Sequence, residues 1–413
     1  MKTKKHLLAA LALTVALGVA AQSAVQKSML ESFVKYAAID SQSHDDSICT
    51  QGQRKMALAL KADIEEAVSR SKVAGVDVRL SDETYLYVTI PANTKKSCPS
   101  MGISCHLDVT PEQLGTNIRP IVDTRNGHTI VRTDGTTLLG ADDKCGCTIA
   151  VQLIRALLTD KSIKHGVMQF AFCPNEDVGR AADAIDSTIF SPDILFDLDG
   201  EGNCDVTDSN FTARRFDVRF IGKDAHPGNA KAEGFGDALA AAATFIADIP
   251  VEYRPENTEG TQGYIHPWNF EQKPKQMDVT VMTRVRYFDK AEGELFDRLL
   301  KEALADVARK HPNVRHEILV DKMQYENVAY TLYPGIKDVV LSAAAKIGKE
   351  IKFVPERGGT TASMFAVKGL KGGMCVFTGQ HKVHTTNEYA DLQEMEEAYT
   401  LMLEIIKQVA TLK

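Results

Sequence analysis

Side chains able to bind metal ions recur along this 413-residue chain where an apolar run ends or a glycine marks a turn. Two imidazoles and three carboxylates among them form the donor set that two zinc ions need, because zinc takes nitrogen and oxygen ligands at low coordination number. A further glutamate remains to move protons, so the set predicts two-metal hydrolysis. The residues concerned are His106, Asp108, Asp142, Asp143, Glu176, Asp177, Asp199 and His384.

The first two pairs of this set receive roles from their surroundings. His106 ends the apolar run MGISCH and is predicted to bind metal, with Asp108 steadying its imidazole. Asp142 follows a glycine at a strand-to-helix corner and is predicted to bridge both metals with its two oxygens, while Asp143 supports it. Adjacent aspartates at a helix start also act as ordinary caps of backbone N–H groups, and the remaining ligands favour the bridge.

The next two acidic segments complete the set. Glu176 and Asp177 end a very apolar run, and because neighbouring residues point in different directions, one can hold metal while the other faces substrate. Asp177 is predicted to be the ligand and Glu176 the general base. Asp199, in the segment DLDG, is predicted to complete the first metal site. Asp197 points to the same face two residues earlier and stays an alternative to Asp199.

The elements that must position these residues are typical of an α/β fold. Short buried strands are expected at 101–106, 167–175 and 193–200, and a helix at 144–158. Acidic groups at strand ends indicate a ligand crevice beyond the carboxyl edge of a sheet. We therefore expect a mixed sheet with flanking helices.

The pattern changes near Phe211. Between 211 and 325 the expected order is strand, helix, strand, strand, helix, strand, which is the βαββαβ ferredoxin-like unit. This segment contains none of the proposed ligands, and His384 comes after it. The catalytic domain is therefore predicted to comprise 22–210 and 326–413, with 211–325 inserted. Two sequential domains are the alternative, but they would separate His384 from the other ligands.

The first 21 residues read as a secretory signal peptide. MKTKK is a basic start, an apolar stretch follows, and Gly18 to Ala21 are small enough for cleavage. An uncleaved membrane anchor is the alternative. Cleavage predicts an exported protein, periplasmic or secreted, with no membrane attachment afterwards. The eight cysteines show no paired framework, so we expect most of them to be free and structural.

Composition and charge are those of an ordinary globular protein and argue against a nucleic-acid-binding protein. A hydrophobic content of 44% and a charged content of 25% are ordinary for a globular protein. The formal net charge of −7, without a basic run in the mature chain, argues against nucleic acid as a partner. The sequence leaves monomer and homodimer both open.

Several motifs occur in one characteristic order: SCHLDVTP, TDGTTLLGADDKCG, CPNEDVG, DLDG, AHPGNAK, RPENTEGTQGY, RYFD, RGGT and HTTNE. Over essentially the whole mature chain this order resembles peptidase T, the aminotripeptidase of the dinuclear zinc aminopeptidase, carboxypeptidase and aminoacylase superfamily. LLGADDK and the EDVG pair are superfamily signals, whereas AHPGNAK and PENTEG resemble peptidase T in particular.

The resemblance implies a division of the ligands between two metals. It implies His106 and Asp199 on one zinc, Asp177 and His384 on the other, and Asp142 as the bridge, with a cis peptide after Asp142. It also implies Glu176 as base and Asp108 behind His106. Mn²⁺ or Co²⁺ would suit the same mixed nitrogen and oxygen donors as the two Zn²⁺ ions.

The resemblance further implies that the inserted domain is a lid. His226, in AHPG, would reach from this lid to the substrate. Arg286 in RYFD and Arg357 in RGGT lie in matching motifs, and a planar guanidinium suits the C-terminal carboxylate of a peptide. The implied fold is a zinc-exopeptidase-like catalytic domain interrupted by the ferredoxin-like lid.

Three features depart from the family. Asp177 stands where this branch usually has glutamate, and Thr361 replaces the aspartate of the RGGTD pattern, which affects the substrate side. The export signal is also unexpected, because peptidase T enzymes are typically cytoplasmic.

The leading hypothesis for function is therefore an exopeptidase that releases the N-terminal residue of short peptides, most of all tripeptides. A dipeptidase, carboxypeptidase or N-acyl amino acid deacylase with the same dizinc site is the alternative within hydrolysis. A peptide-binding relative that has lost catalysis is a third hypothesis, and the intact Glu176 argues against it.

Overall fold

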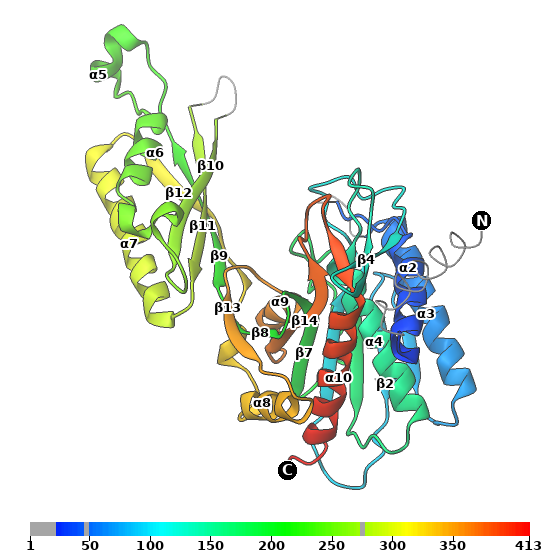
Figure 1. Cartoon of the computed structure of the whole chain (residues 1–413). Helices are drawn as coiled ribbons and strands as arrows, with labels where there is room; N and C mark the ends of the chain where they lie inside the picture. Colours follow the sequence, from blue (N-terminus) through cyan, green and yellow to red (C-terminus); the bar gives the residue numbers. More distant parts are fainter. Residues whose placement is uncertain (1–21, 45–48, 273–276) are drawn as a thin grey trace, which may run out of the picture.

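The computed structural model describes residues 22–44, 49–272 and 277–413, so the predicted signal peptide lies outside the described residues. Two sheets organise this part of the chain. Figure 1 shows them in two units that stand side by side, with the four-stranded sheet and its helices set apart from the larger unit.

The larger unit contains an eleven-stranded mixed sheet. Its central strands run in the order β6, β3, β7, β14, and each of these neighbours is parallel. The strands are β1 (Asp77–Leu80), β2 (Leu86–Ile90), β3 (Met101–His106), β4 (Ile121–Arg125), β5 (His128–Arg132), β6 (Met168–Cys173), β7 (Ile194–Glu201), β8 (Asp205–Asn210), β13 (Lys352–Glu356), β14 (Gly373–His381) and β15 (Tyr389–Asp391).

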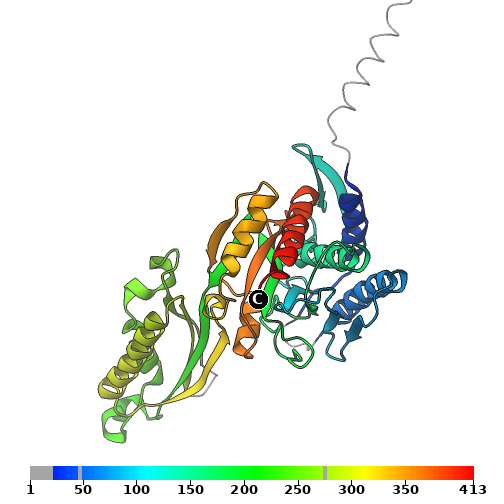
Figure 2. The same cartoon turned by 90° about the horizontal axis from the view of Figure 1, so that it is seen from below.

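Helices cover both faces of this sheet, which explains why its central strands read as continuous apolar runs. The main core lies between one face and a helical layer, whereas a smaller core packs α9 against the other face. Alternation at β2 shows the division. Leu86 and Val88 belong to the main core, whereas Tyr87, and Tyr85 directly before the strand, belong to the smaller one. Figure 2 shows the helical layer from below. The helices are α2 (Ala24–Ala37), α3 (Gln51–Arg70), α4 (Ala141–Thr159), α8 (Ile336–Lys346), α9 (Thr361–Val367) and α10 (Leu392–Val409).

The smaller unit has the predicted βαββαβ order. Its antiparallel sheet runs β10, β11, β9, β12, and α6 and α7 pack on it around a separate core. A short helix, α5, projects from the end remote from the large sheet (Figure 1). The elements are β9 (Thr212–Ile221), α5 (Ala230–Glu233), α6 (Ala238–Ala247), β10 (Tyr264–Glu271), β11 (Val279–Tyr287), α7 (Lys290–Lys310) and β12 (Arg315–Tyr325).

The chain enters the smaller unit directly after β8 and leaves it before α8 and β13, which return to the large sheet. The predicted fold class, a mixed α/β unit interrupted by a ferredoxin-like insertion, is confirmed. All eight cysteines lie in the described part of the chain and are free there. No helix among the described residues is both long and apolar enough to span a membrane.

Candidate dinuclear metal site

The carboxyl ends of the central parallel strands bring the predicted ligands together. His106 is the last residue of β3, Asp199 lies near the end of β7, and His384 follows β14. Glu176 and Asp177 follow β6. Parallel neighbours end at the same edge of a sheet, so residues far apart in sequence meet there.

Asp142 lies at the centre of this group. Its Oδ1 is 2.7 Å from His106 Nε2, and its Oδ2 is 3.1 Å from His384 Nε2. The peptide between Asp142 and Asp143 is cis, as the family resemblance implied. Burial opposes ionisation of Asp142, yet the two neighbouring imidazoles lower the pKa of its carboxyl group below the ordinary range. Each oxygen therefore faces a different histidine, which is the arrangement that a bridging ligand requires.

The structure distinguishes the two aspartates of β7 that the sequence left as alternatives. Asp199 Oδ1 lies 3.6 Å from His106 Nε2. Asp197, in contrast, accepts hydrogen bonds from the Ser104 hydroxyl at 2.7 Å and from the backbone N–H of Ala362 at 3.1 Å. Asp197 is therefore committed to the support of the sheet and of α9, and Asp199 is the one that joins His106.

The second histidine, His384, lies beside two carboxylates, as His106 does. His384 Nε2 lies 3.0 Å from Asp177 Oδ1, while Asp177 Oδ2 is buried without a hydrogen-bond partner. Hydrogen bonds to Asp142 and then Asp177 raise the pKa of His384 to about 11. Burial raises the pKa of Asp177 to about 6. A cation held between these carboxylates would favour their charged forms, since an opposite charge nearby lowers the pKa of a carboxyl group.

The donor atoms fit two metal ions. His106, Asp142 and Asp199 form one set and Asp142, Asp177 and His384 another, and in each set the donor atoms lie within 4.8 Å of one another. Ligands about 2.0–2.2 Å from one zinc ion can lie up to about twice that distance apart, so both sets are of suitable size. The buried, unpartnered oxygen of Asp177 supports the same conclusion.

Another cluster of similar size beneath the site has a structural role. Cys105, Asp143 and Cys147 also lie close together. However, both oxygens of Asp143 accept backbone hydrogen bonds at 3.0 Å, from His106 and from Gly146. Asp143 thus ties the end of β3 to the start of α4, whereas the sequence predicted that it would support Asp142.

Asp108 also acts mainly on the backbone. Its two oxygens accept hydrogen bonds from the N–H groups of Glu176 at 3.0 Å and Asp177 at 3.1 Å. His106 Nδ1 lies 3.5 Å from Asp108 Oδ1, which is long for a hydrogen bond. Asp108 therefore fixes the loop after β6 as well as standing behind His106.

The same loop is fixed from its other side by α3. Gln53 donates to Asn175 Oδ1 at 2.9 Å and accepts from the Asn175 N–H at 3.1 Å. Asn175 adopts a left-handed conformation with φ of 61°, which is uncommon for residues other than glycine. These contacts turn the chain so that Glu176 faces the cavity.

Glu176 is a partly buried carboxylic acid next to the ligands. The pKa of Glu176 lies well above its ordinary range, mainly because burial disfavours the charged carboxylate. The nearby His106 acts in the opposite direction, while the negative charges of Asp199 and Asp177 add to the increase. A carboxylate with a raised pKa beside metal ligands is suited to accept and return a proton near neutral pH.

Glu388 is the residue of this site that the sequence analysis missed, although it lies in the quoted motif HTTNE. Its Oε2 accepts hydrogen bonds from the N–H groups of Leu139 at 2.9 Å and Gly140 at 2.7 Å, and its Oε1 accepts from the Asp142 N–H at 3.0 Å. Burial raises the pKa of Glu388 to about 7. One carboxylate thus connects the segment of His384 to the turn that presents Asp142.

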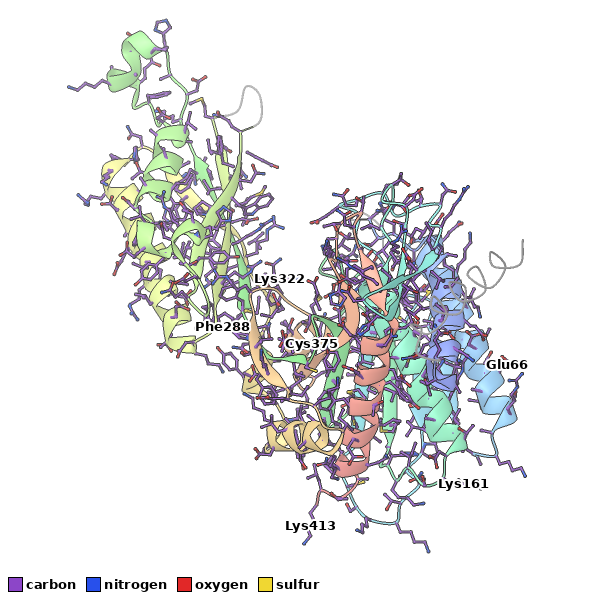
Figure 3. The ribbon with its side chains drawn as sticks, viewed as in Figure 1. Glu66, Lys161, Phe288, Lys322, Cys375 and Lys413 are labelled. Atoms are coloured by element: carbon purple, nitrogen blue, oxygen red, sulfur yellow. The ribbon has the colours of Figure 1, made fainter. Side chains whose placement is uncertain are left out.

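The ligands open into a cavity of about 610 Å³ that Asp142, Glu176, Asp177, Asp199 and His384 all line. It continues past Cys375, which Figure 3 labels, to residues of β8 and β13 and to Tyr325 at the end of β12. The cavity therefore reaches from the candidate metal site to the junction with the four-stranded unit.

The three predicted substrate residues lie outside the lining of this cavity. The Arg286 guanidinium is buried and lies 5.3 Å from the ring centre of Tyr325, which does line it. Arg357 donates to the carbonyl of Gly260 at 2.7 Å. His226 is exposed, just before α5 at the remote end of the smaller unit (Figure 1), and the structure does not bring it to the metal ligands.

Comparison with known proteins agrees with this arrangement. Residues 102–408 match the peptidase family M20/M25/M40. Peptidase T of Geobacillus kaustophilus is 30% identical over 416 residues, covering 93% of this chain and 98% of its own.

Solved structures share the fold. Aminopeptidase PepT from Bacillus cereus superposes with a TM-score of 0.75 at 24% identity, covering 94% of this chain and 99% of its own. A tripeptidase from Staphylococcus aureus gives a TM-score of 0.73 at 20% identity, covering 93% and 98%. The resemblance to peptidase T noted in the motifs is thereby confirmed, and the chain belongs to the peptidase family M20/M25/M40.

Proposed function

We propose that the protein is a metal-dependent aminopeptidase that releases the N-terminal residue of short peptides, tripeptides above all. The observation that carries the proposal is Asp142, whose two oxygens face the histidines of two separate ligand sets in a cavity that Glu176 also lines. The family to which the chain belongs and the tripeptidase of similar fold support it.

Two divalent cations would occupy the site, with zinc as the metal that its nitrogen and oxygen donors suit best. His106 and Asp199 would hold one, Asp177 and His384 the other, and Asp142 both. When bound, such ions polarise the scissile carbonyl and make water more acidic. Asp177 is one methylene shorter than the usual glutamate and keeps its charge.

Glu176 would carry the proton through the reaction. It accepts the proton of the attacking water and then gives it to the amino group that leaves when the peptide bond breaks. The backbone N–H group of Glu176 donates a hydrogen bond to Asp108. This contact orients Glu176, whose carboxylate is not itself a metal ligand.

The C-terminal part of the substrate would extend toward the four-stranded unit, the lid in this proposal. Arg286 and Arg357 stand at that junction and would hold the C-terminal carboxylate. Arg357 would have to exchange its backbone carbonyl partners for the substrate. His226 would reach the reacting carbonyl only after the lid moves toward the large sheet, where its imidazole would stabilise the oxyanion.

We further propose that the protein acts outside the cytoplasm, as the basic start and apolar stretch of the first 21 residues indicate. Its substrates there would be oligopeptides with free amino and carboxyl termini. N-terminal sequencing of the protein purified from expressing cells tests this, and an N-terminus at Met1 contradicts it.

The activity is tested with purified protein loaded with Zn²⁺, Mn²⁺ or Co²⁺. Release of the N-terminal amino acid is followed from Leu-Gly, Leu-Gly-Gly and Leu-Gly-Gly-Gly, with N-acetylated and C-amidated tripeptides as controls. We expect the free tripeptide to be cleaved fastest. Release of the C-terminal residue, or cleavage of the N-acetylated peptide at an equal rate, would instead indicate a carboxypeptidase or a deacylase.

A further inference from the structure

Gln380 is a buried polar side chain to which the proposed mechanism gives no role. It lies near the end of β14, is 2% exposed, and lines the same cavity as the metal ligands. A buried carboxamide requires partners for its N–H groups and its oxygen, since a polar group left unpaired away from water costs stability.

The Gln380 amide has partners on one side only. Its Nε2 donates to the backbone oxygen of Asp199 at 2.9 Å and to Asp199 Oδ1 at 3.3 Å. Both of these atoms are acceptors, so the amide nitrogen must face them and the Oε1 must face away. Gln380 Oε1 is buried and has no hydrogen-bond partner in the described part of the chain. An acceptor is therefore left without a partner in a side chain of the cavity wall, next to a candidate metal ligand.

The wall around this acceptor is negatively charged. Glu201 is the direct neighbour of Gln380 across the β7–β14 pair, and Asp205 follows it beyond the turn. Both line the cavity, and none of the described lining residues is a lysine or arginine. Glu201 Oε1 accepts the Lys382 N–H at 2.6 Å, which directs this carboxylate toward the end of β14.

These features define the chemistry of a ligand that would fit. It must donate hydrogen bonds to Gln380 Oε1. It should also be cationic, because Glu201 and Asp205 line the wall at this position and none of the described lining residues is a lysine or arginine that would oppose them. It must also sit beside Asp199, at the first metal set. The α-ammonium group of a peptide meets all three conditions, because it carries three N–H donors and lies one carbon atom away from the scissile carbonyl.

We propose that Gln380 Oε1, together with Glu201, is the receptor for the α-ammonium group of the substrate. This proposal rests on the proposed aminopeptidase function and explains how the enzyme would recognise a free N-terminus. Gln380 and Glu201 would act as specificity-determining residues, and Asp205 would add to the negative potential. The amide nitrogen of Gln380 would at the same time position Asp199.

The test separates recognition of the amine from support of Asp199. Wild type and variants are assayed on Leu-Gly-Gly and on the analogue that carries a hydroxyl group in place of its α-amino group. Loss of a charge-assisted hydrogen bond typically changes affinity by about ten- to a hundredfold. The ratio that is compared is the kcat/KM of Leu-Gly-Gly divided by the kcat/KM of the hydroxyl analogue. In Gln380→Met we expect this ratio to fall by about tenfold or more, mainly because the KM of Leu-Gly-Gly rises. A purely structural role would lower the activity on both peptides equally and leave the ratio unchanged.

Glu201→Gln provides a second measurement, because this exposed side chain does not touch Asp199 in any contact of the structure. We expect it to lower the same ratio by about threefold or more, with metal content unchanged. Gln152→Met is the matched control: Gln152 is also a buried glutamine, but it lies on α4 and donates to Ser28, so its ratio should equal that of wild type. An unchanged ratio in both Gln380→Met and Glu201→Gln overturns the proposal, whereas a wild type that cleaves neither peptide overturns the proposed function itself.

Discussion

Replacement of Glu388 tests whether the metal site depends on a residue that touches no metal. Its carboxylate accepts three backbone hydrogen bonds from the turn before and at Asp142. It is 2% exposed, so water cannot replace those bonds. We expect Glu388→Gln to weaken metal binding at both ligand sets, because the residue shared by both sets loses its support.

The magnitude follows from the hydrogen bonds. In Glu388→Gln, the remaining oxygen can still accept hydrogen bonds from Leu139 and Gly140. The new NH₂ group then faces the N–H of Asp142, and because both groups are donors, no hydrogen bond forms between them. One buried unsatisfied N–H group and one lost charge-assisted bond cost about 2–4 kcal/mol in the free energy of unfolding. Residues that orient metal ligands typically change metal affinity by about 10- to 100-fold when replaced.

The assay is competition with a chelator of known affinity, followed by metal analysis of both equivalents, alongside urea unfolding of the metal-free protein. Glu394→Gln is the control: Glu394 is also buried and accepts from His381 at 2.5 Å, but it contacts none of the candidate ligands. We expect this control to lose stability and keep its metal affinity. If Glu388→Gln were to bind both metals like wild type, or to lose only one of them, the inferred dependence on Asp142 would be wrong.

The remaining predictions concern the base, the metals and the cavity wall. Glu176→Gln should keep both metals and lose about 10²- to 10⁴-fold in kcat, which steady-state kinetics and metal analysis check together. Apparent metal affinity should rise with pH, because a hydrogen bond to Asp142 holds the pKa of His384 at about 11 and the metal takes only the neutral imidazole. Each displaced proton should contribute about a tenfold increase per pH unit, and calorimetry in buffers of different ionisation enthalpy counts the protons. Removal of the metals with a chelator should lower the thermal midpoint, by an amount equivalent to about 4 kcal/mol when the free metal had exceeded its Kd a thousandfold. Gly359→Ala should cost about 1–3 kcal/mol and lower activity, because its Cβ would lie 2.8 Å from the ring of Tyr325.

Specific results would contradict these predictions, and a matched variant controls for one of them. Near-normal turnover of metal-loaded Glu176→Gln would remove that residue from the role of base. A metal affinity that does not change between pH 6 and 9 would show that no proton leaves His384. Gly358→Ala is the control for Gly359→Ala, since its Cβ would approach only the flexible end of Glu356, at 3.3 Å. Equal stability of the two alanine variants would mean that Tyr325 moves freely.

The sequence by itself determined which residue types could bind metal and in which order they occur. His106 could be recognised as a candidate, and so could the pair Asp197 and Asp199, because each lies where a buried apolar strand ends and the carboxyl ends of parallel strands share one edge. The βαββαβ order of 211–325 was predictable for a similar reason, since strand and helix periodicities are local properties of the chain. The fold class is confirmed, and the predicted ligands converge.

The tertiary structure alone decided between residues that local pattern makes equivalent. Asp197 and Asp199 share one face of β7, and only the contacts of Asp197 with Ser104 and Ala362 remove it from the site. The role of Glu388 likewise depends on Asp142, 246 positions away in sequence. The hydrogen-bond partner of a buried side chain is set by what the fold places against it, and neither periodicity nor spacing carries that information.

The same reason applies to the substrate side. The free oxygen of Gln380 exists because Asp199 offers two acceptors to its amide nitrogen, a condition that no stretch of sequence around either residue contains. His226 illustrates the converse: its motif indicated a place near the reaction, whereas the fold holds it at the far end of the four-stranded unit. The distance between two packed units depends on how they are oriented, and local sequence does not encode that orientation.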